Sequence, residues 1–330
     1  MHLRAGRRHL VLRNTQIDTP CAIPSYSSRA RPPDPLQGFL ENTLKDIEGP
    51  VLLSAYDLFY RAGLGIAYDV FSEIDEAPTP AVLLDSGGYE EIWNNNAILA
   101  GIIPSGGRGL WSEEHYNEIL ATWETKTELI AVTYDAVAPM SQQIDRARQM
   151  AKVFPWLTVD VLLKPIDGRS FLRVSDVSPF SNELADFALI GVTEKELGAS
   201  MRDRLNCLAE LRDCLAQAGL ETPIHVFGGL DPLMTPLYFM AGADIFDGLS
   251  WLRYAFTGAG SQYEQGYLSL EHPADDLQSA SWRQRSANLA TLIRLEASMR
   301  QVADGASIDL AFGERASRIC ETWDQVWNET

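Results

Sequence analysis

Three aspartates each end an apolar segment of the sequence: Asp85 after AVLL, Asp135 after LIAVTY and Asp247 after ADIF. A single aspartate in such a place is most simply a loop or helix cap. Three carboxylates that converge on one place are costly unless they are paired or functional, because each loses solvation. Two carboxylates beside a small cavity can do glycosidic chemistry, in which one attacks the anomeric carbon and the other moves the proton of the leaving and entering groups.

The segment after Asp85 reads SGGYE and suits a flat, ring-shaped ligand. Its glycines, Gly87 and Gly88, let a ring approach the backbone closely, and Tyr89 can stack on that ring. A core aromatic is the competing interpretation of Tyr89. A second glycine-rich stretch, GGRG at 106–109, is a weak indication of a phosphate site and is more typical of a surface hairpin.

Eight apolar, β-rich segments alternate with amphipathic helical stretches along the chain. Parallel strands that are buried on both faces read as continuous apolar runs, as these segments do. The pattern predicts an α/β fold, a (β/α)8 TIM barrel, with a doubly wound open sheet as the alternative. Barrel enzymes carry their catalytic groups at the C-terminal ends of the strands, where the three aspartates stand. The expected strands are 21–25, 51–55, 81–85, 129–135, 158–164, 186–192, 224–228 and 243–247.

The 330 residues fit one barrel domain with additions, so we expect a single domain over 1–330. Residues 86–127 form a long insertion between two expected strands, and about 282–330 forms a helical tail. Helices are also expected at 112–126, 141–154 and 199–219, the last of which stops at Gly219.

The net charge of −18 argues against a nucleic-acid binder with a simple basic face. The charge is uneven, because residues 1–31 hold six arginines and one acid, a local charge of +5. This segment is interpreted either as a solvated tail or edge strand, or as an arm that contacts phosphates.

Composition indicates the class of protein and its expected location. It is 46% hydrophobic and 22% charged, which is typical of a globular chain. The sequence lacks a run of about 18 apolar residues, and MHLRAGRRHLVLR lacks a long apolar core and a small-residue cleavage site, so we expect no membrane helix, no secretory signal and a cytoplasmic location. The four cysteines form no CxxC pair, which argues against a structural zinc site and a disulfide scaffold.

In several ordered segments the sequence resembles the tRNA-guanine transglycosylases, the queuine and archaeosine tRNA-ribosyltransferases, which are (β/α)8 barrels. LLDSGGYE resembles the family's Asp-Ser-Gly-Gly-aromatic-Gln motif, and LWSEEHYNEI with LIAVTYDAVAP is similar to its LSPE helix and the strand that ends in a base-reading aspartate. ALIGVTEKE resembles its base-binding turn. GADIFDGLSWLRYAFTG resembles its G-x-D-x-F-D-x5-R motif, including the Asp-to-Arg spacing. The resemblance covers about residues 20–300.

The resemblance implies a role for each matching residue. Asp247 would be the nucleophile that forms a covalent ribosyl-enzyme intermediate, and Asp85 would be the general acid and base that helps guanine leave and the new base enter. Asp135 would accept hydrogen bonds from the amino and ring N–H edge of the base, and Arg253 would contact a flanking phosphate. The rest of the expected base-binding set is Ser86, Gly87, Gly88, Tyr89, Glu90, Lys164, the backbone of Gly191 and Val192, and Glu196, which would support their turn.

The sequence also departs from the family pattern. The family's three zinc cysteines and the downstream histidine are missing, and Ala287 stands at the place of that histidine, so we expect no metal, no zinc subdomain and no cofactor. Glu90 replaces a glutamine, and Lys164 stands near the place of another. We hypothesise that Glu90 and Lys164 form an ion pair in place of a Gln–Gln contact, with Lys164 donating to O6 of the base. The alternative is that Lys164 pairs with an acidic neighbour. His225, inside IHVFGG, is interpreted as a strand-end core histidine, with a general base as the alternative.

The leading expectation is exchange of guanine in nucleic acid, preferably DNA, for a 7-deazaguanine such as 7-cyano-7-deazaguanine. The alternatives are a queuine-type enzyme acting on tRNA, a non-catalytic partner subunit of one, and a small-molecule nucleoside transglycosylase. Because the body of the chain is acidic, a protein partner is expected to assist DNA binding. No membrane partner is expected.

Overall fold

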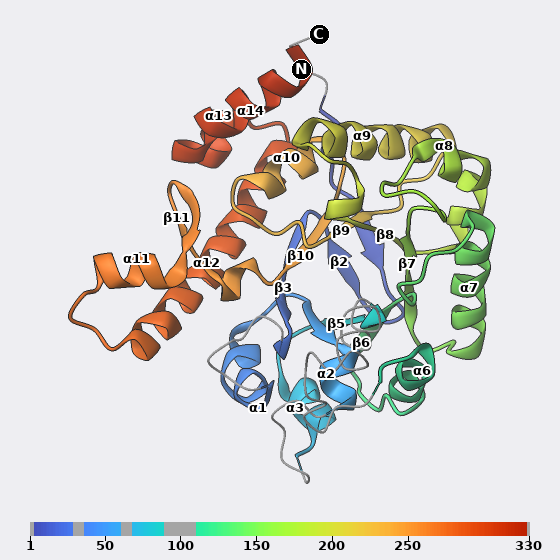
Figure 1. Cartoon of the computed structure of the whole chain (residues 1–330), viewed down its shortest axis with the longest axis horizontal. Helices are drawn as coiled ribbons and strands as arrows, with labels where there is room; N and C mark the ends of the chain where they lie inside the picture. Colours follow the sequence, from blue (N-terminus) through green and yellow to red (C-terminus); the bar gives the residue numbers. More distant parts are fainter. Residues whose placement is uncertain (1–2, 29–35, 61–67, 89–109, 329–330) are drawn as a thin grey trace.

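The computed structural model describes residues 3–28, 36–60, 68–88 and 110–328, and its centre is a closed barrel of eight parallel strands (Figure 1). The strands run around the barrel in the order β10-β3-β4-β5-β6-β7-β8-β9. Each of the eight expected strands is one of them, so the (β/α)8 prediction is confirmed and the open sheet is wrong. Their bounds are β3 (Cys21–Tyr26), β4 (Val51–Ser54), β5 (Ala81–Asp85), β6 (Glu128–Val132), β7 (Thr158–Leu163), β8 (Leu189–Thr193), β9 (Ile224–Phe227) and β10 (Ile245–Gly248).

An apolar layer fills the half of the barrel interior that is formed by the N-terminal parts of the strands. Side chains alternate between the two faces of a strand, and Leu83 and Ile245 belong to the buried cluster inside the barrel. A hairpin of β1 (His9–Val11) and β2 (Gln16–Asp18) adds Leu10 and Ile17 to the same cluster. The hairpin therefore covers the N-terminal end of the barrel, opposite the end that carries Asp85 and Asp247.

Arginines near the N-terminus are held at this end of the barrel. Arg8 pairs with Asp244, which immediately precedes β10, at 2.9 Å. Arg4 pairs with Asp213 at 2.7 Å. The sequence analysis allowed an N-terminal arm that contacts phosphates. In the structure these two arginines of the arm are in ion pairs, at the end of the barrel opposite the C-terminal ends of the strands.

The helices pack outside the barrel (Figure 1). The helix expected at 112–126 is shorter, the one at 141–154 matches closely, and the one at 199–219 begins at a capping box between Ser200 and Asp203. Gly219 follows that helix with φ +73°, a conformation that favours glycine. The bounds are α1 (Leu36–Gly38), α2 (Ala55–Phe59), α3 (Val70–Glu76), α6 (Glu113–Ala121), α7 (Met140–Val153), α8 (Val174–Val177), α9 (Met201–Gln217), α10 (Met234–Met240), α11 (Glu264–Glu271), α12 (Leu277–Ala303), α13 (Ile308–Phe312) and α14 (Ala316–Asn328).

The C-terminal extension is helical, as expected, and begins with α12. Before it, a hairpin of β11 (Tyr254–Thr257) and β12 (Gly260–Tyr263) leads into α11, and both stand to one side of the barrel in Figure 1. Of the insertion expected at 86–127, residues 89–109 lie outside the described residues, including the glycine-rich 106–109. In the described ranges, no helix has both the length and the apolar composition that a membrane crossing requires.

Candidate active site

Asp85 and Asp247, the two predicted catalytic carboxylates, lie at the same end of the barrel. Asp85 is the last residue of β5 and Asp247 the third of β10, and all the strands are parallel. Each stands two residues after an interior side chain, Leu83 or Ile245, so the alternation of the strands turns both toward the interior. β3 and β4 separate the two strands around the barrel. The shared rim agrees with the sequence analysis, while a nucleobase slot between the two carboxylates stays a prediction.

Asp247 is buried, with 6% of its surface exposed, and accepts hydrogen bonds from β3 and from the residue that follows β9. Ser25, in β3, donates its hydroxyl to Oδ2 at 2.7 Å. The backbone N–H of Gly228, just after β9, donates to Oδ1 at 3.0 Å. Gly228 adopts φ +77°, which favours glycine and turns this N–H inward. The contacts fix the carboxylate and stabilise its negative charge, which its predicted role as a nucleophile would require.

His225 lies behind Asp247, deeper in the barrel. Its Nε2 is 3.3 Å from Oδ1 of Asp247, and its Nδ1 is 2.8 Å from Oδ2 of Asp160 in β7. Neither His225 nor Asp160 is exposed. Burial lowers the pKa of His225, but the contacts with Asp160 and Asp247 outweigh it and raise the pKa to about 9. His225 is thus a buried histidine of the core, as the sequence analysis expected, and it also contacts Asp247, the predicted nucleophile.

Lys164 joins two of the predicted base-binding residues. Its Nζ lies 2.9 Å from Oδ1 of Asp135 and 2.7 Å from Oε2 of Glu196. Burial lowers the pKa of Lys164, but these two carboxylates outweigh it and hold the pKa above its ordinary value. The alternative in which Lys164 pairs with acidic neighbours is therefore observed. Tyr89 and Glu90 fall in the part of the chain that is not described, so the Glu90–Lys164 pair stays a prediction.

Asp135 lies three residues beyond the end of β6, whereas the sequence analysis placed it as the last residue of the strand. The strand ends early because the side-chain hydroxyl of Thr133, and not a backbone carbonyl of β6, accepts the N–H of Leu162 in β7, at 2.9 Å. The Ser86 hydroxyl accepts the N–H of Asp135 at 3.2 Å. The loop that carries Asp135 is therefore tied to the residue that follows Asp85.

Gly87 and Gly88 make room for the protein's own chain. A Cβ on Gly88 would lie 2.7 Å from the carbonyl oxygen of Asp135. A Cβ on Gly87 would lie 2.8 Å from Nε1 of Trp111, which donates to the carbonyl of Ser86 at 3.0 Å. The missing side chains thus allow the Asp135 loop and Trp111 to pack against this segment, while contact with a bound ring stays a prediction.

Gly191 and Val192 lie inside β8, within the expected strand 186–192, and are paired with β7 and β9, so they precede the turn that the family resemblance assigned to them. The turn itself is Glu194–Glu196. Glu194 holds it, because its carboxylate accepts from both Arg204 and Tyr238 at 2.6 Å. Glu196 was expected to support the turn, and its side chain pairs with Lys164 instead.

Arg253 is exposed and follows a 3-10 turn (Ser250–Leu252) after β10. The fully buried side chain of Asn288, in α12, holds the backbone of the segment around Arg253 by hydrogen bonds. The Asn288 side chain donates to the carbonyls of Trp251 and Tyr254, both at 2.7 Å, and accepts the N–H of Phe256 at 2.9 Å. Asn288 therefore positions the backbone on both sides of Arg253, a role that the sequence did not reveal.

Two basic side chains of the candidate site each contact two carboxylates. Asp135 and Glu196 share Lys164, and Asp160 and Asp247 share His225, while Asp85 stands at the end of β5. No protein-family model and no curated protein sequence matches this chain.

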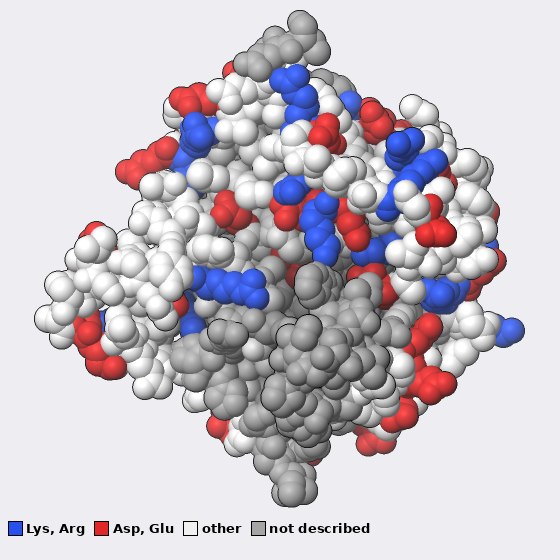
Figure 2. Space-filling view, in the orientation of Figure 1, with Lys and Arg blue, Asp and Glu red and all other residues white. Residues whose placement is uncertain are grey.

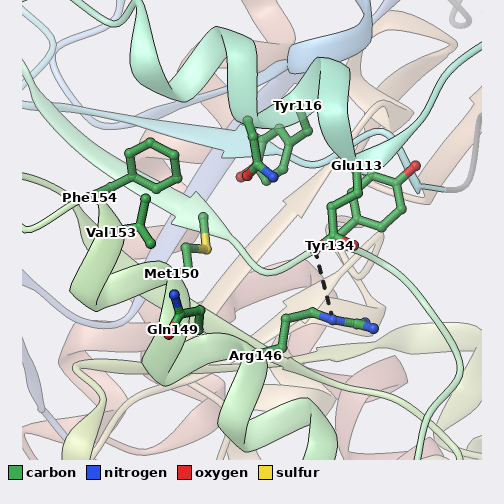
Figure 3. A pocket seen from close by; sticks show the side chains of 9 residues that line it. Glu113, Tyr116, Tyr134, Arg146, Gln149, Met150, Val153 and Phe154 are labelled. Atoms are coloured by element: carbon green, nitrogen blue, oxygen red, sulfur yellow. Dashed lines mark ion pairs between the residues drawn. The ribbon is translucent and has the colours of Figure 1, made fainter.

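A separate cavity of about 270 Å³ lies outside the barrel (Figure 3). It is lined by residues of α6 and α7 and by Tyr134, and Arg146 faces Glu113 across it at 3.8 Å. None of the predicted site residues lines this cavity, so it is not the expected nucleobase slot.

Across the described ranges, no three His, Cys, Asp or Glu side chains are grouped in a way that could hold a metal ion.

Proposed function

We propose that the protein is a guanine transglycosylase that exchanges a guanine base in nucleic acid, preferably DNA, for a 7-deazaguanine such as 7-cyano-7-deazaguanine. The observation that supports this most directly is the placement of Asp247, which is buried and fixed by Ser25 and Gly228 at the rim that also carries Asp85. A fixed carboxylate and a second carboxylate on the same interior face are the two groups that a double displacement at a sugar carbon needs.

In the first displacement, one oxygen of Asp247 bonds to C1′ of the target nucleotide. The C1′–N9 bond breaks, its electron pair leaves with guanine, and Asp85 gives the departing base a proton. In the second, the incoming base loses its N9 proton to Asp85 and attacks C1′, so the bond to Asp247 breaks and the carboxylate is regenerated. Two inversions at one carbon give net retention. The target nucleotide must be unpaired or flipped to reach the rim.

Lys164 and Asp135 complement the edge of guanine. Guanine offers an acceptor at O6 beside donors at N1 and N2. The Lys164 ammonium supplies a donor for O6, and the Asp135 carboxylate supplies acceptors for the N–H groups. The Lys164–Asp135 contact of 2.9 Å keeps this donor and acceptor side by side before any base enters. Adenine, with an amino group in place of O6, would oppose the Lys164 ammonium.

DNA is preferred over tRNA because the zinc ligands typical of the tRNA enzymes are missing from the sequence. Lys and Arg side chains are interspersed with Asp and Glu on the described part of the face in Figure 2, which does not form one continuous basic surface. Arg253, exposed six residues after Asp247, remains the candidate for contact with a flanking phosphate. We further propose a partner protein that supplies the remaining DNA contacts, and a cytoplasmic location.

The test is an incorporation assay with radiolabelled guanine and radiolabelled 7-cyano-7-deazaguanine. Each is incubated with the full-length protein and plasmid DNA, with tRNA, or with free deoxyguanosine. Label in DNA supports the proposal, and label in tRNA or in the nucleoside moves it to the corresponding alternative. If label enters none of the three, with single-stranded DNA included to remove the need for an opening partner, the proposed function is wrong.

A further inference from the structure

A buried histidine lies behind the proposed nucleophile and takes no part in the two displacements described above. The ring of His225 spans the interior from Asp160 to Asp247, with Nδ1 2.8 Å from one carboxylate and Nε2 3.3 Å from the other. Nδ1 is in hydrogen-bond contact with Asp160, while Nε2 lies within ion-pair distance of Asp247 without hydrogen-bond geometry. A neutral imidazole carries one N–H and one lone pair, so one nitrogen of a neutral ring would direct its lone pair at a negative oxygen. A ring that carries both protons is attracted on both sides.

The surroundings of His225 favour the same charge state. Among the described residues, the charged groups that face it are Asp160 from β7 and Asp247 from β10. On the neighbouring strand β8, Gly191 presents no side chain, and on its own strand the ring of Phe227 lies 3.9 Å away between centroids. The pKa of about 9 agrees with this arrangement.

Asp160 has no other evident task. It is fully buried in an apolar strand, and within the described chain its second oxygen, Oδ1, accepts no hydrogen bond. A buried carboxylate is costly unless a charge compensates it, and His225 supplies that charge. The fit is close, because a Cβ on Gly191 would lie 2.7 Å from this same Oδ1. The strand beside Asp160 thus has room for the pair only with glycine at this position.

We propose that Asp160 and His225 are a positioning pair for Asp247. Asp160 keeps the imidazole protonated, and the imidazolium orients Asp247 and stabilises its carboxylate when the bond to the sugar breaks. The inference rests on the proposed function. When Asp247 bonds to C1′ it loses its negative charge, and the imidazolium stays paired with Asp160. When the incoming base displaces Asp247, the electron pair of the C1′–O bond returns to a carboxylate that already faces a positive charge. No proton leaves His225 in either step.

The charge of His225 can be measured without any reaction. Imidazole ¹⁵N and ¹H shifts of the full-length protein are followed from pH 6 to 10, and His225 is assigned by the signal lost in His225→Gln. We expect an imidazolium that titrates near pH 9 in the wild type. We expect the midpoint to fall by about one to two pH units in Asp160→Asn and to be unchanged in His272→Gln, a matched change at a partly exposed histidine. A neutral His225 at pH 7.5 in the wild type overturns the proposal, even if Asp160→Asn does not fold.

The role in the reaction is read from the pH profile and from the covalent intermediate. If label enters a substrate, Asp160→Asn should lose about tenfold in exchange rate between pH 6.5 and 8, where the wild type stays level. The Asp247 adduct should accumulate in this variant, because breaking the ester is slowed more than forming it. Parallel profiles with no accumulation would mean a purely structural pair and would overturn the proposal. Absence of exchange in the wild type would instead refute the proposed function, and the imidazole titration would still decide the charge of His225.

Discussion

Nζ of Lys164 lies 2.9 Å from Oδ1 of Asp135, and this contact joins the end of β7 to the loop after β6. The lysine side chain is 6% exposed, and Glu196 approaches the same nitrogen at 2.7 Å. One cation therefore compensates two carboxylates at the rim. The contact has two consequences, one for stability and one for ligand recognition.

Replacing Lys164 with methionine removes the cation and leaves Asp135 and Glu196 facing each other. We expect the free energy of unfolding at pH 7 to fall by about 2–4 kcal/mol, because a partly buried pair loses one partner. Urea denaturation measures this, with Lys152→Met on the exposed face of α7 as the control. A loss in Lys164→Met no larger than in the control would show that the pair contributes nothing.

Lys164→Gln retains a donor but loses the charge. We expect the affinity for guanine to fall by about tenfold, because a charge-assisted hydrogen bond to O6 becomes a neutral one. Calorimetry with free guanine or a soluble deazaguanine measures the dissociation constant. Full affinity in Lys164→Gln would refute a direct contact between this lysine and the base.

The pKa of His225 predicts how stability depends on pH. The folded protein raises this pKa from the ordinary value of 6.5 to about 9. The stabilisation is therefore complete below about pH 6.5 and is lost as the pH rises through 9, with an amplitude of roughly 3 kcal/mol. Urea midpoints between pH 6 and 10 should converge for the wild type and His225→Gln as the pH increases. A constant difference between the two proteins over this range would contradict the raised pKa.

Gly88→Ala should displace the loop that carries Asp135. The added Cβ would meet the Asp135 carbonyl oxygen at 2.7 Å, and this backbone can move only together with its contacts to Ser86 and Lys164. We expect a loss of about 1–3 kcal/mol in stability together with weaker guanine binding. Gly49→Ala is the control, since nothing lies within 4 Å of its Cβ position. Equal stability of the two variants would show that the loop adapts freely.

Asn288→Ala should destabilise the segment around Arg253. The change leaves the N–H of Phe256 and the carbonyl of Trp251 without their buried partner, which costs about 2–4 kcal/mol in all. Thermal or urea unfolding measures the loss, and Gln301→Ala, exposed on the same helix, should change stability by less than about 0.5 kcal/mol. A loss as small as that of the control would mean that water replaces the Asn288 side chain.

The barrel could be predicted from the sequence because each strand is buried on both faces and therefore appears as an apolar run with a turn after it. The same pattern placed Asp85 and Asp247 at one rim, since parallel strands share their C-terminal end. Asp135 was placed at the end of a strand because LIAVTY reads as one β-rich run, whereas the Thr133 hydroxyl accepts the N–H of Leu162 and the strand ends at Val132.

The partners of Asp247 could not be predicted in the same way. Ser25 and His225 lie about 200 residues apart in the sequence, and both reach Asp247 only because the barrel closes with β10 between β3 and β9. One signal was present: Asp160 interrupts the apolar run TVDVLL, and an acid in the middle of a buried strand requires a compensating charge. The sequence does not say which cation supplies it, because that depends on the neighbouring strands.

The proposed chemistry stands on Asp247 as the nucleophile and Asp85 as the acid and base. The most direct measurement is mass spectrometry of the denatured protein after brief incubation with single-stranded DNA containing guanine. A DNA adduct that maps to Asp247 is expected in the wild type. It should be absent in Asp247→Asn, with exchange reduced by at least about 10³-fold, and its formation should be slowed in Asp85→Asn. An adduct on another residue, or exchange that survives in Asp247→Asn, would contradict the assignment.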